Sequence, residues 1–150
     1  MWIDREAALA AIGVDCEARC QNCVDLGAVG SLVAALRTHG SVPALAEWAC
    51  VALRNIAGID AGGDACVSSG AVPAIVAALR THASVPAVAE YASNALLNIG
   101  WTNPSHRAAI VAEGAVPLLA TAFRAHTGDA RQKAREALDK LGYTLAGAPK

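Results

Sequence analysis

Apolar side chains recur along this chain with the spacing of an amphipathic α-helix. Between residues 45 and 56 they fall at i, i+4, i+7, i+8 and i+11, which places them in one stripe along a helix. The same stripe returns between residues 88 and 99. The pattern predicts two long helices that bury equivalent faces. The two stripes consist of Leu45, Ala49, Ala52, Leu53 and Ile56, and of Val88, Ala92, Ala95, Leu96 and Ile99.

The two helices belong to a longer internal repeat of about 43 residues. Residues 27–57 align with residues 70–100 without a gap and are identical at 21 of 31 positions. A third copy begins at Gly114 with G-A-V-P-L-L and ends with A-L-D-K-L at Leu141. Near the N-terminus, residues 8–12 repeat only the closing motif. We therefore expect one helical unit to be stacked several times.

Each repeat is predicted to contain three helices. A short first helix, such as Ser105–Glu113, stops at Gly114, a residue that adopts the left-handed conformation at little cost. A second helix is expected from Pro73 to about Thr81, and Ser84 is a candidate cap for the third helix. The expected units are a partial repeat with a third helix alone at 1–15, full repeats at 16–58, 59–101 and 102–144, the last with a polar C-terminal cap, and a disordered tail at 145–150.

Three helices in about 43 residues, with G-A-V-P opening the second and A-L-x-N-I closing the third, resemble the armadillo repeats. The resemblance covers nearly the whole chain. It implies an all-α, right-handed superhelix, or α-solenoid, of three repeats and a preceding partial repeat. It also implies that the third helices line a concave groove, and that the protein is a non-catalytic interaction module binding an extended or helical peptide there.

The candidate site lies on a second face of the third helices. In armadillo proteins that hold extended peptides, an Asn near the end of each third helix bonds the ligand backbone, and Asn55 and Asn98 match that position. Ala11 and Lys140 occupy it in the first and last third helices. An amide offers both a donor and an acceptor to a peptide unit. The candidate peptide-binding residues are Asn55, Asn98, Trp48, Tyr91, Val51, Asn94, Trp101 and Lys140.

Two structural interpretations of these residues stay open. Asn55 and Asn98 can serve as turn residues that bond the following loop. Trp48 and Tyr91 can serve as partly buried spacers between neighbouring third helices. In the nuclear-import adaptors a Trp precedes the Asn by four residues, whereas Val51 and Asn94 stand there in this chain, which argues against recognition of nuclear signals.

Composition supports a helical binding protein and argues against other classes. Apolar residues make up 55% of the chain, but many are Ala and only six are Phe, Trp or Tyr, which suits closely packed helices. The net charge is −1 and no basic stripe for nucleic acid is present. Apolar runs reach about half the length of a membrane span. We expect a cytoplasmic or nuclear protein with reduced thiols, no cofactor, and a protein or peptide partner rather than nucleic acid or membrane.

The cysteines offer an alternative function. Cys16, Cys20 and Cys23 form C-x3-C-x2-C, the spacing of a radical SAM cluster site, but no strands alternate with helices here as that chemistry requires. Cys23 aligns with Cys66 and Ile110, which indicates a core position filled by a small hydrophobe. Cys16 and Cys20 have no such explanation, so metal binding or thiol redox chemistry remains a less favoured alternative.

No catalytic arrangement is recognisable, and the protein is not expected to be an enzyme. His39, His82 and His126 recur at the ends of the second helices, but stacked repeats lie about 10 Å apart, too far to share a metal ion. A structural alternative to peptide binding is a scaffold fragment or a self-associating array. The chain begins inside a third helix, so the open N-terminal end is a candidate surface for homo-oligomer formation.

Overall fold

Nine α-helices follow one another between residues 17 and 150, the part of the chain that the computed structural model describes. Within these residues the only β-pairing is an isolated bridge between Tyr143 and Pro149. The partial repeat expected at 1–15 lies outside the described residues, as does Cys16. The helices are α2 (Glu17–Asp25), α3 (Ala28–His39), α4 (Pro43–Ile56), α5 (Asp60–Ser68), α6 (Ala71–Thr81), α7 (Pro86–Ile99), α8 (Pro104–Ala112), α9 (Ala115–Ala125) and α10 (Gly128–Leu141).

The helices follow the predicted order of a short, a middle and a long helix, three times in succession. Each middle helix starts after a glycine in the left-handed conformation: Gly27 at φ 73°, Gly70 at φ 77° and Gly114 at φ 80°. A side chain at such a φ is strained, so glycine is the residue that allows the chain to turn from the first helix into the second.

Helix boundaries differ from the predictions in detail. Helix α6 begins at Ala71 rather than Pro73, because a proline in the first turn lacks only an N–H that has no helical partner. Ser84 does not cap α7; Val85 takes the cap position and no side chain bonds the first turn. In α8, by contrast, the side chain of Asn103 accepts a hydrogen bond of 2.8 Å from the Ser105 N–H.

The predicted apolar stripes form the core. In α7 all five stripe residues are buried, and in α4 four are buried while Leu45 is partly buried. Helix α10 buries one stripe of Ala130, Ala134, Ala137 and Leu138. Its charged residues lie on the remaining faces, while the buried stripe packs against α7 and α9.

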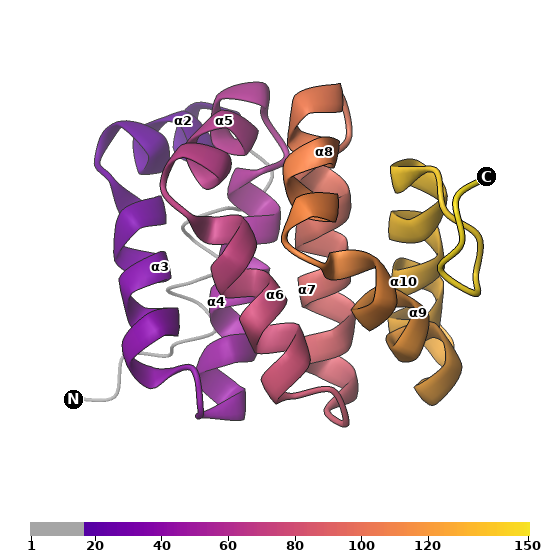
Figure 1. Ribbon diagram of the computed structural model, residues 1–150. Helices are drawn as coiled ribbons and strands as arrows, with labels where there is room; N and C mark the ends of the chain where they lie inside the picture. The colour runs from indigo at the N-terminus through magenta and orange to yellow at the C-terminus, as the bar shows by residue number, and fades with distance from the viewer. Residues whose placement is uncertain (1–16) are drawn as a thin grey trace.

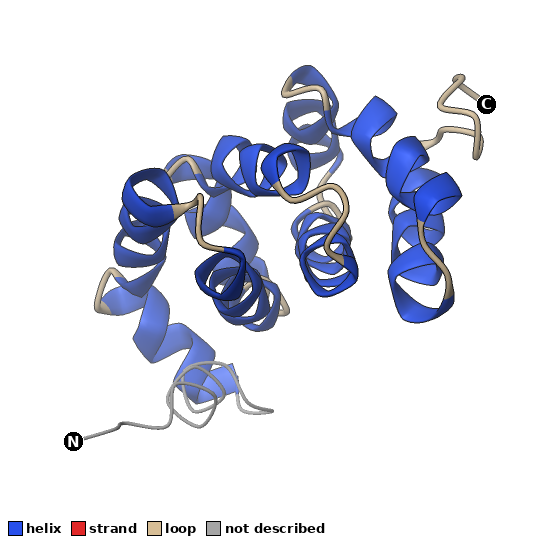
Figure 2. Ribbon diagram, turned by 90° about the horizontal axis from the view of Figure 1, so that it is seen from below, coloured by secondary structure: helices blue, strands red, loops and turns tan. Residues whose placement is uncertain are grey.

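The long helices form one row and the middle helices form a second row packed against it (Figures 1 and 2). Helix α7 packs between α4 and α10, and these contacts are more extensive than those of α6 with α3 and α9. The short helices α2, α5 and α8 lie at one end of the long helices (Figure 1). Closer packing in one row means that this row lies on the inner side of a curved array.

Two of the recurring histidines connect successive units. The Nε2 atom of His82, after α6, lies 2.6 Å from the carbonyl oxygen of Gly40 in the loop before α4. The Nε2 atom of His126, after α9, lies 2.8 Å from the carbonyl oxygen of Ala83 in the loop before α7. Both side chains are buried, whereas His39 at the equivalent position is exposed. Each buried ring thus satisfies a carbonyl of the preceding unit.

The C-terminal tail differs from the expected disorder at residues 145–150. The chain folds back after Gly142, with hydrogen bonds from the Thr144 N–H to the Ala148 carbonyl and from the Lys150 N–H to the Gly142 carbonyl. The Nζ atom of Lys150 lies 2.7 Å from Oδ1 of Asp139 in α10. Leu145 packs against the core and supplies the anchor that the smaller tail residues lack.

Candidate functional site

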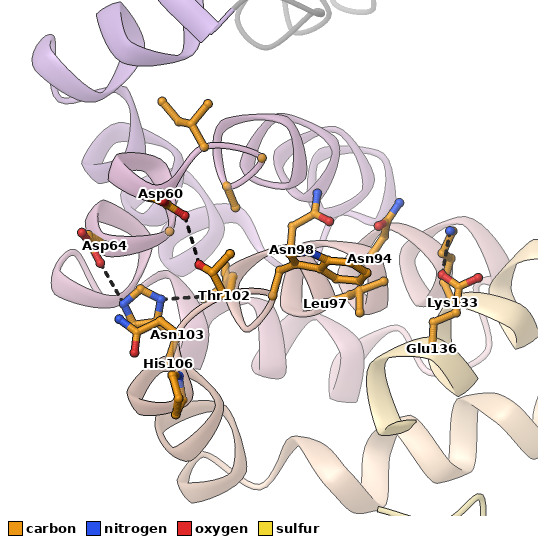
Figure 3. A pocket seen from close by; sticks show the side chains of 17 residues that line it. Asp60, Asp64, Asn94, Leu97, Asn98, Thr102, Asn103, His106, Lys133 and Glu136 are labelled. Atoms are coloured by element: carbon orange, nitrogen blue, oxygen red, sulfur yellow. Dashed lines mark hydrogen bonds and ion pairs between the residues drawn. The ribbon is translucent and has the colours of Figure 1, made fainter. Parts of the chain in front are cut away.

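A groove of about 740 Å³ opens beside the C-terminal half of α7 (Figure 3). The first turns of α5 and α8 and the loop before α8 form one side of it, and α10 contributes Lys133 and Glu136 on the other side. Asn94 and Asn98 of α7 line the groove between these walls. Helix α7 therefore places two amides in one hollow at the inner side of the array.

Within the described part of the chain, one hydrogen bond orients the amide of Asn98. Its Nδ2 atom donates a hydrogen bond of 2.9 Å to the carbonyl oxygen of Arg54 in α4. Since that partner is an acceptor, the NH₂ group and not the oxygen must face it. Among the described residues Oδ1 has no hydrogen-bond donor, and one Nδ2 hydrogen is also unused. The side chain is partly exposed, so it can still accept one bond and donate another.

Asn55, the matching residue of α4, has different partners. Its Oδ1 accepts hydrogen bonds from Arg54 Nε at 3.1 Å and Nη2 at 2.8 Å. The Arg54 guanidinium lies 5.5 Å from the centre of the Tyr91 ring in α7. Arg54 therefore links the two long helices and holds the acceptor of Asn55, which leaves the Asn55 NH₂ group as the group that a ligand can reach.

Of the other predicted residues of α4 and α7, some pack in or against the core and one lines the groove. Val51 is only 9% exposed and belongs to the core, so it offers little surface to a ligand. Trp48 and Tyr91 are half-buried, and Tyr91 packs against the core cluster. Burial also raises the pKa of the Tyr91 hydroxyl. Asn94 is partly exposed and lines the groove.

Trp101 and Lys140 meet although they are far apart in the sequence. Trp101 follows α7, lines the groove and is 55% exposed. Lys140, in the last turn of α10, places its Nζ atom 4.2 Å from the centre of the Trp101 ring. The structure therefore brings these two predicted residues together as a cation–π pair at the edge of the groove.

Acidic side chains in the groove escaped the sequence prediction. Asp60 and Asp64 come from the first turns of α5, and Glu136 comes from α10. Hydrogen bonds from Lys133 and Gln132 hold the pKa of the Glu136 carboxyl below its ordinary value. The alignment gave no signal for Glu136, because Asn94 occupies the matching position of α7.

Two sets of polar side-chain contacts connect α5, α8 and the C-terminal end of α7 at the end of the groove (Figure 3). The Thr102 hydroxyl donates to Asp60 Oδ1 at 3.0 Å. The buried His106 ring has Nδ1 3.1 Å from the Ile99 carbonyl oxygen and Nε2 3.0 Å from Asp64 Oδ1. Asp64 and Asp60 keep much of their surface exposed, so their charge still acts on the groove.

None of the cysteines within residues 17–150 lines the groove. Cys50 and Cys66 are fully buried, and burial raises the pKa of each thiol to about 12. Cys66 thus fills the core position predicted from its alignment with Ile110. Cys20 is buried, and its Sγ atom lies 3.5 Å from the Asn55 carbonyl oxygen. Among residues 17–150, no group of three His, Cys, Asp or Glu side chains is placed to hold a metal ion.

No single helix among residues 17–150 has the length and apolar composition to cross a membrane. Two successive pairs, α5 with α6 and α8 with α9, reach that length only when joined across bends of 77° and 80°.

Comparison with known proteins shows the fold. No protein-family model and no curated protein matches the chain. Among solved structures, a designed armadillo repeat protein, YIII(Dq.V1)4CPAF in complex with peptide (KR)4, is similar with a TM-score of 0.79 and 21% sequence identity. The likeness covers 89% of this chain and 55% of that chain, so this chain spans about half the length of its neighbour. The chain has the armadillo-repeat fold.

Proposed function

We propose that this chain is a non-catalytic binding module that holds an extended segment of a partner protein against α4, α7 and α10. The observation that carries the proposal is the amide of Asn98, which is oriented by the Arg54 carbonyl yet keeps an acceptor and a donor on the groove wall. An extended segment carries one donor and one acceptor per residue, and such an amide can satisfy both. The right-handed winding of three repeats that the resemblance implies is part of this proposal.

The charge of the groove favours a basic segment. Among the described residues that line the groove, Asp60, Asp64 and Glu136 contribute three carboxylates and Lys133 contributes one ammonium group, while the Lys140 ammonium lies at the edge. Complementary charge steers a ligand to its site and disfavours partners of the wrong sign. The structural neighbour holds a peptide of alternating Lys and Arg, which supports (KR)4 as the first probe.

Replacing both amides, in Asn55→Ala with Asn98→Ala, is expected to weaken binding of (KR)4 at least about fivefold, since each lost hydrogen bond contributes about 0.5–1.5 kcal/mol. Isothermal titration calorimetry gives the affinity. Asn98→Ala also removes the bond to the Arg54 carbonyl, so a circular dichroism melt accompanies each titration and confirms that helix content is retained.

Asn22→Ala is the matched control, because Asn22 is an exposed amide on α2 away from the groove. It should bind (KR)4 as the wild type does. Equal affinities for the double variant, the control and the wild type, with helix content intact, would show that these amides do not hold the ligand.

Association with further repeats or with a second copy is the alternative function, and one observation favours it. His82 and His126 each bond a carbonyl of the preceding unit, whereas His39 at the equivalent position is exposed and has no such bond among the described residues. A docked unit could supply that carbonyl. Light scattering over a concentration series tests this alternative, and a mass that stays monomeric throughout would exclude self-association.

A further inference from the structure

The Trp101 ring carries a cation although it stands at the edge of a groove. Its exposed fraction is 55%, unusual for an indole, and the Lys140 ammonium lies 4.2 Å from the ring centre. Trp101 reaches this place from the end of α7, and Lys140 reaches it from the last turn of α10. The face of an indole attracts cations because its π-electrons are negative, and Trp is the strongest such site among the side chains.

Lys140 is held by little else. In the described residues four other charged groups of α10 form ion pairs, Lys133 with Glu136 and Arg135 with Asp139, and Asp139 also pairs with Lys150 of the tail; Asp129 and Arg131 form none. Lys140 has no carboxylate within the distance of an ion pair there. The Lys140 ammonium therefore gives up part of its hydration for contact with the Trp101 ring alone. Such a contact is weak, so another cation can displace the ammonium from the ring.

The position of Lys140 in the repeat places it on the path of a bound segment. In α7 the equivalent position holds Asn98, whose free acceptor faces the groove. In α10 the lysine folds back toward α7 instead. A segment that bonds Asn98 and continues toward α10 therefore meets the Trp101 ring and the ammonium group upon it.

We propose that the face of Trp101 is a subsite for a basic side chain of the bound segment, and that Lys140 is its internal competitor. This inference rests on the proposed function and adds the chemistry of one contact. An arginine suits the subsite best, because its planar guanidinium stacks on an aromatic ring and is more weakly hydrated than an ammonium group. Lys140 opposes such a ligand twice, by covering the ring and by repelling its charge.

The test compares Lys140→Gln with Arg131→Gln. Both substitutions remove one positive charge from α10 and one cation–π contact, since Arg131 lies 4.3 Å from the Phe123 ring, but Arg131 and Phe123 do not line the groove beside α7. Affinities for (KR)4 and for a neutral peptide of alternating Gln and Ser are measured by calorimetry. Lys140→Gln should strengthen (KR)4 binding about two- to fivefold beyond the effect of Arg131→Gln.

A second substitution ties this effect to the ring. Trp101→Leu should weaken (KR)4 binding, and in its background Lys140→Gln should have no more effect than Arg131→Gln. Affinity for the neutral peptide should not change in any of these variants by more than about twofold. Because Trp101 and Lys140 are not core residues, the variants should keep the helix content of the wild type.

The outcomes separate the two proposals. If the wild type binds neither peptide, the proposed function fails and the subsite fails with it. If the wild type binds (KR)4 but Lys140→Gln matches Arg131→Gln, or Trp101→Leu binds as the wild type does, only the subsite is overturned. Proton NMR adds a direct readout: the Lys140 Cε protons should resonate upfield in the free protein and return toward ordinary values when (KR)4 is added.

Discussion

At the scale of single residues, equivalent positions in the repeats do not have equivalent contacts. Asn55 and Asn98 occupy the same place, yet Arg54 holds the oxygen of one amide and the Arg54 carbonyl holds the nitrogen of the other. The alignment identifies both asparagines, but not these partners, because Leu97 stands where a second Arg54 would be. The equivalence of the two positions could be predicted from the sequence; the contacts of the two amides could not.

The cation–π contact of Trp101 with Lys140 likewise could not be predicted from the sequence. Trp101 and Lys140 were each candidates, but only the stacking of α10 on α7 brings the ammonium group onto the ring. The groove carboxylates were missed because they come from two helices far apart in the sequence, α5 and α10, and share no motif. Contacts between residues distant in the sequence depend on how the repeat units stack on one another. The spacing of residues within one unit does not determine this stacking.

Ser93 gives a prediction about stability. Its hydroxyl is fully buried in α7, and among the described residues Oγ has no hydrogen-bond partner. The aligned residue of α4 is Cys50, also fully buried, so the position favours a small apolar group. Ser93→Ala should raise the free energy of unfolding by about 1 kcal/mol, because a buried hydroxyl without a partner loses its hydration.

Urea denaturation followed by circular dichroism measures this change. Ser31→Ala in α3 is the control, since Ser31 is an exposed helical serine and the substitution brings a comparable gain in helix propensity. A gain no larger than that of the control would mean that the Ser93 hydroxyl is satisfied in solution.

At the scale of the helix, apolar spacing and glycine placement gave correct predictions where local physics decides. The stripes of α4 and α7 are buried, and Gly114 ends the first helix in the left-handed conformation as predicted. The prediction of a Ser84 cap was wrong, because Val85 occupies the cap position. The tail was expected to be disordered because its last residues are small, but Leu145 packs on the core and the backbone bonds itself.

The histidine links make a testable contribution at this scale. His82 is buried and bonds the Gly40 carbonyl of the preceding unit. His82→Ala should lower the free energy of unfolding by about 1–3 kcal/mol, because a buried hydrogen bond and the packing of the ring are lost together.

His39→Ala provides the matched control, since His39 has the same place in its repeat but is exposed. It should change the free energy of unfolding by less than about 0.5 kcal/mol. Both values come from urea titration at constant pH. If the two variants lose equal stability, the histidine bond does not connect the units.

At the scale of the whole molecule, stacking makes a surface that no single repeat contains. The repeat pattern predicted stacked helical units, and the similarity to a designed armadillo repeat protein shows that fold. The groove needs α5, α7, α8 and α10 at once, because each supplies part of the wall. The central claim is that an extended segment lies along this groove and bonds the amide of Asn98.

Two-dimensional NMR of the ¹⁵N-labelled protein, titrated with (KR)4, tests that claim most directly. The side-chain NH₂ signals of Asn98 and Asn94 and the indole N–H signal of Trp101, assigned with single substitutions, should shift progressively and saturate together. Signals of the exposed residues of α3, α6 and α9 should stay in place. Saturable shifts confined to α3, α6 and α9, with the Asn98 and Trp101 signals unmoved, would contradict the account.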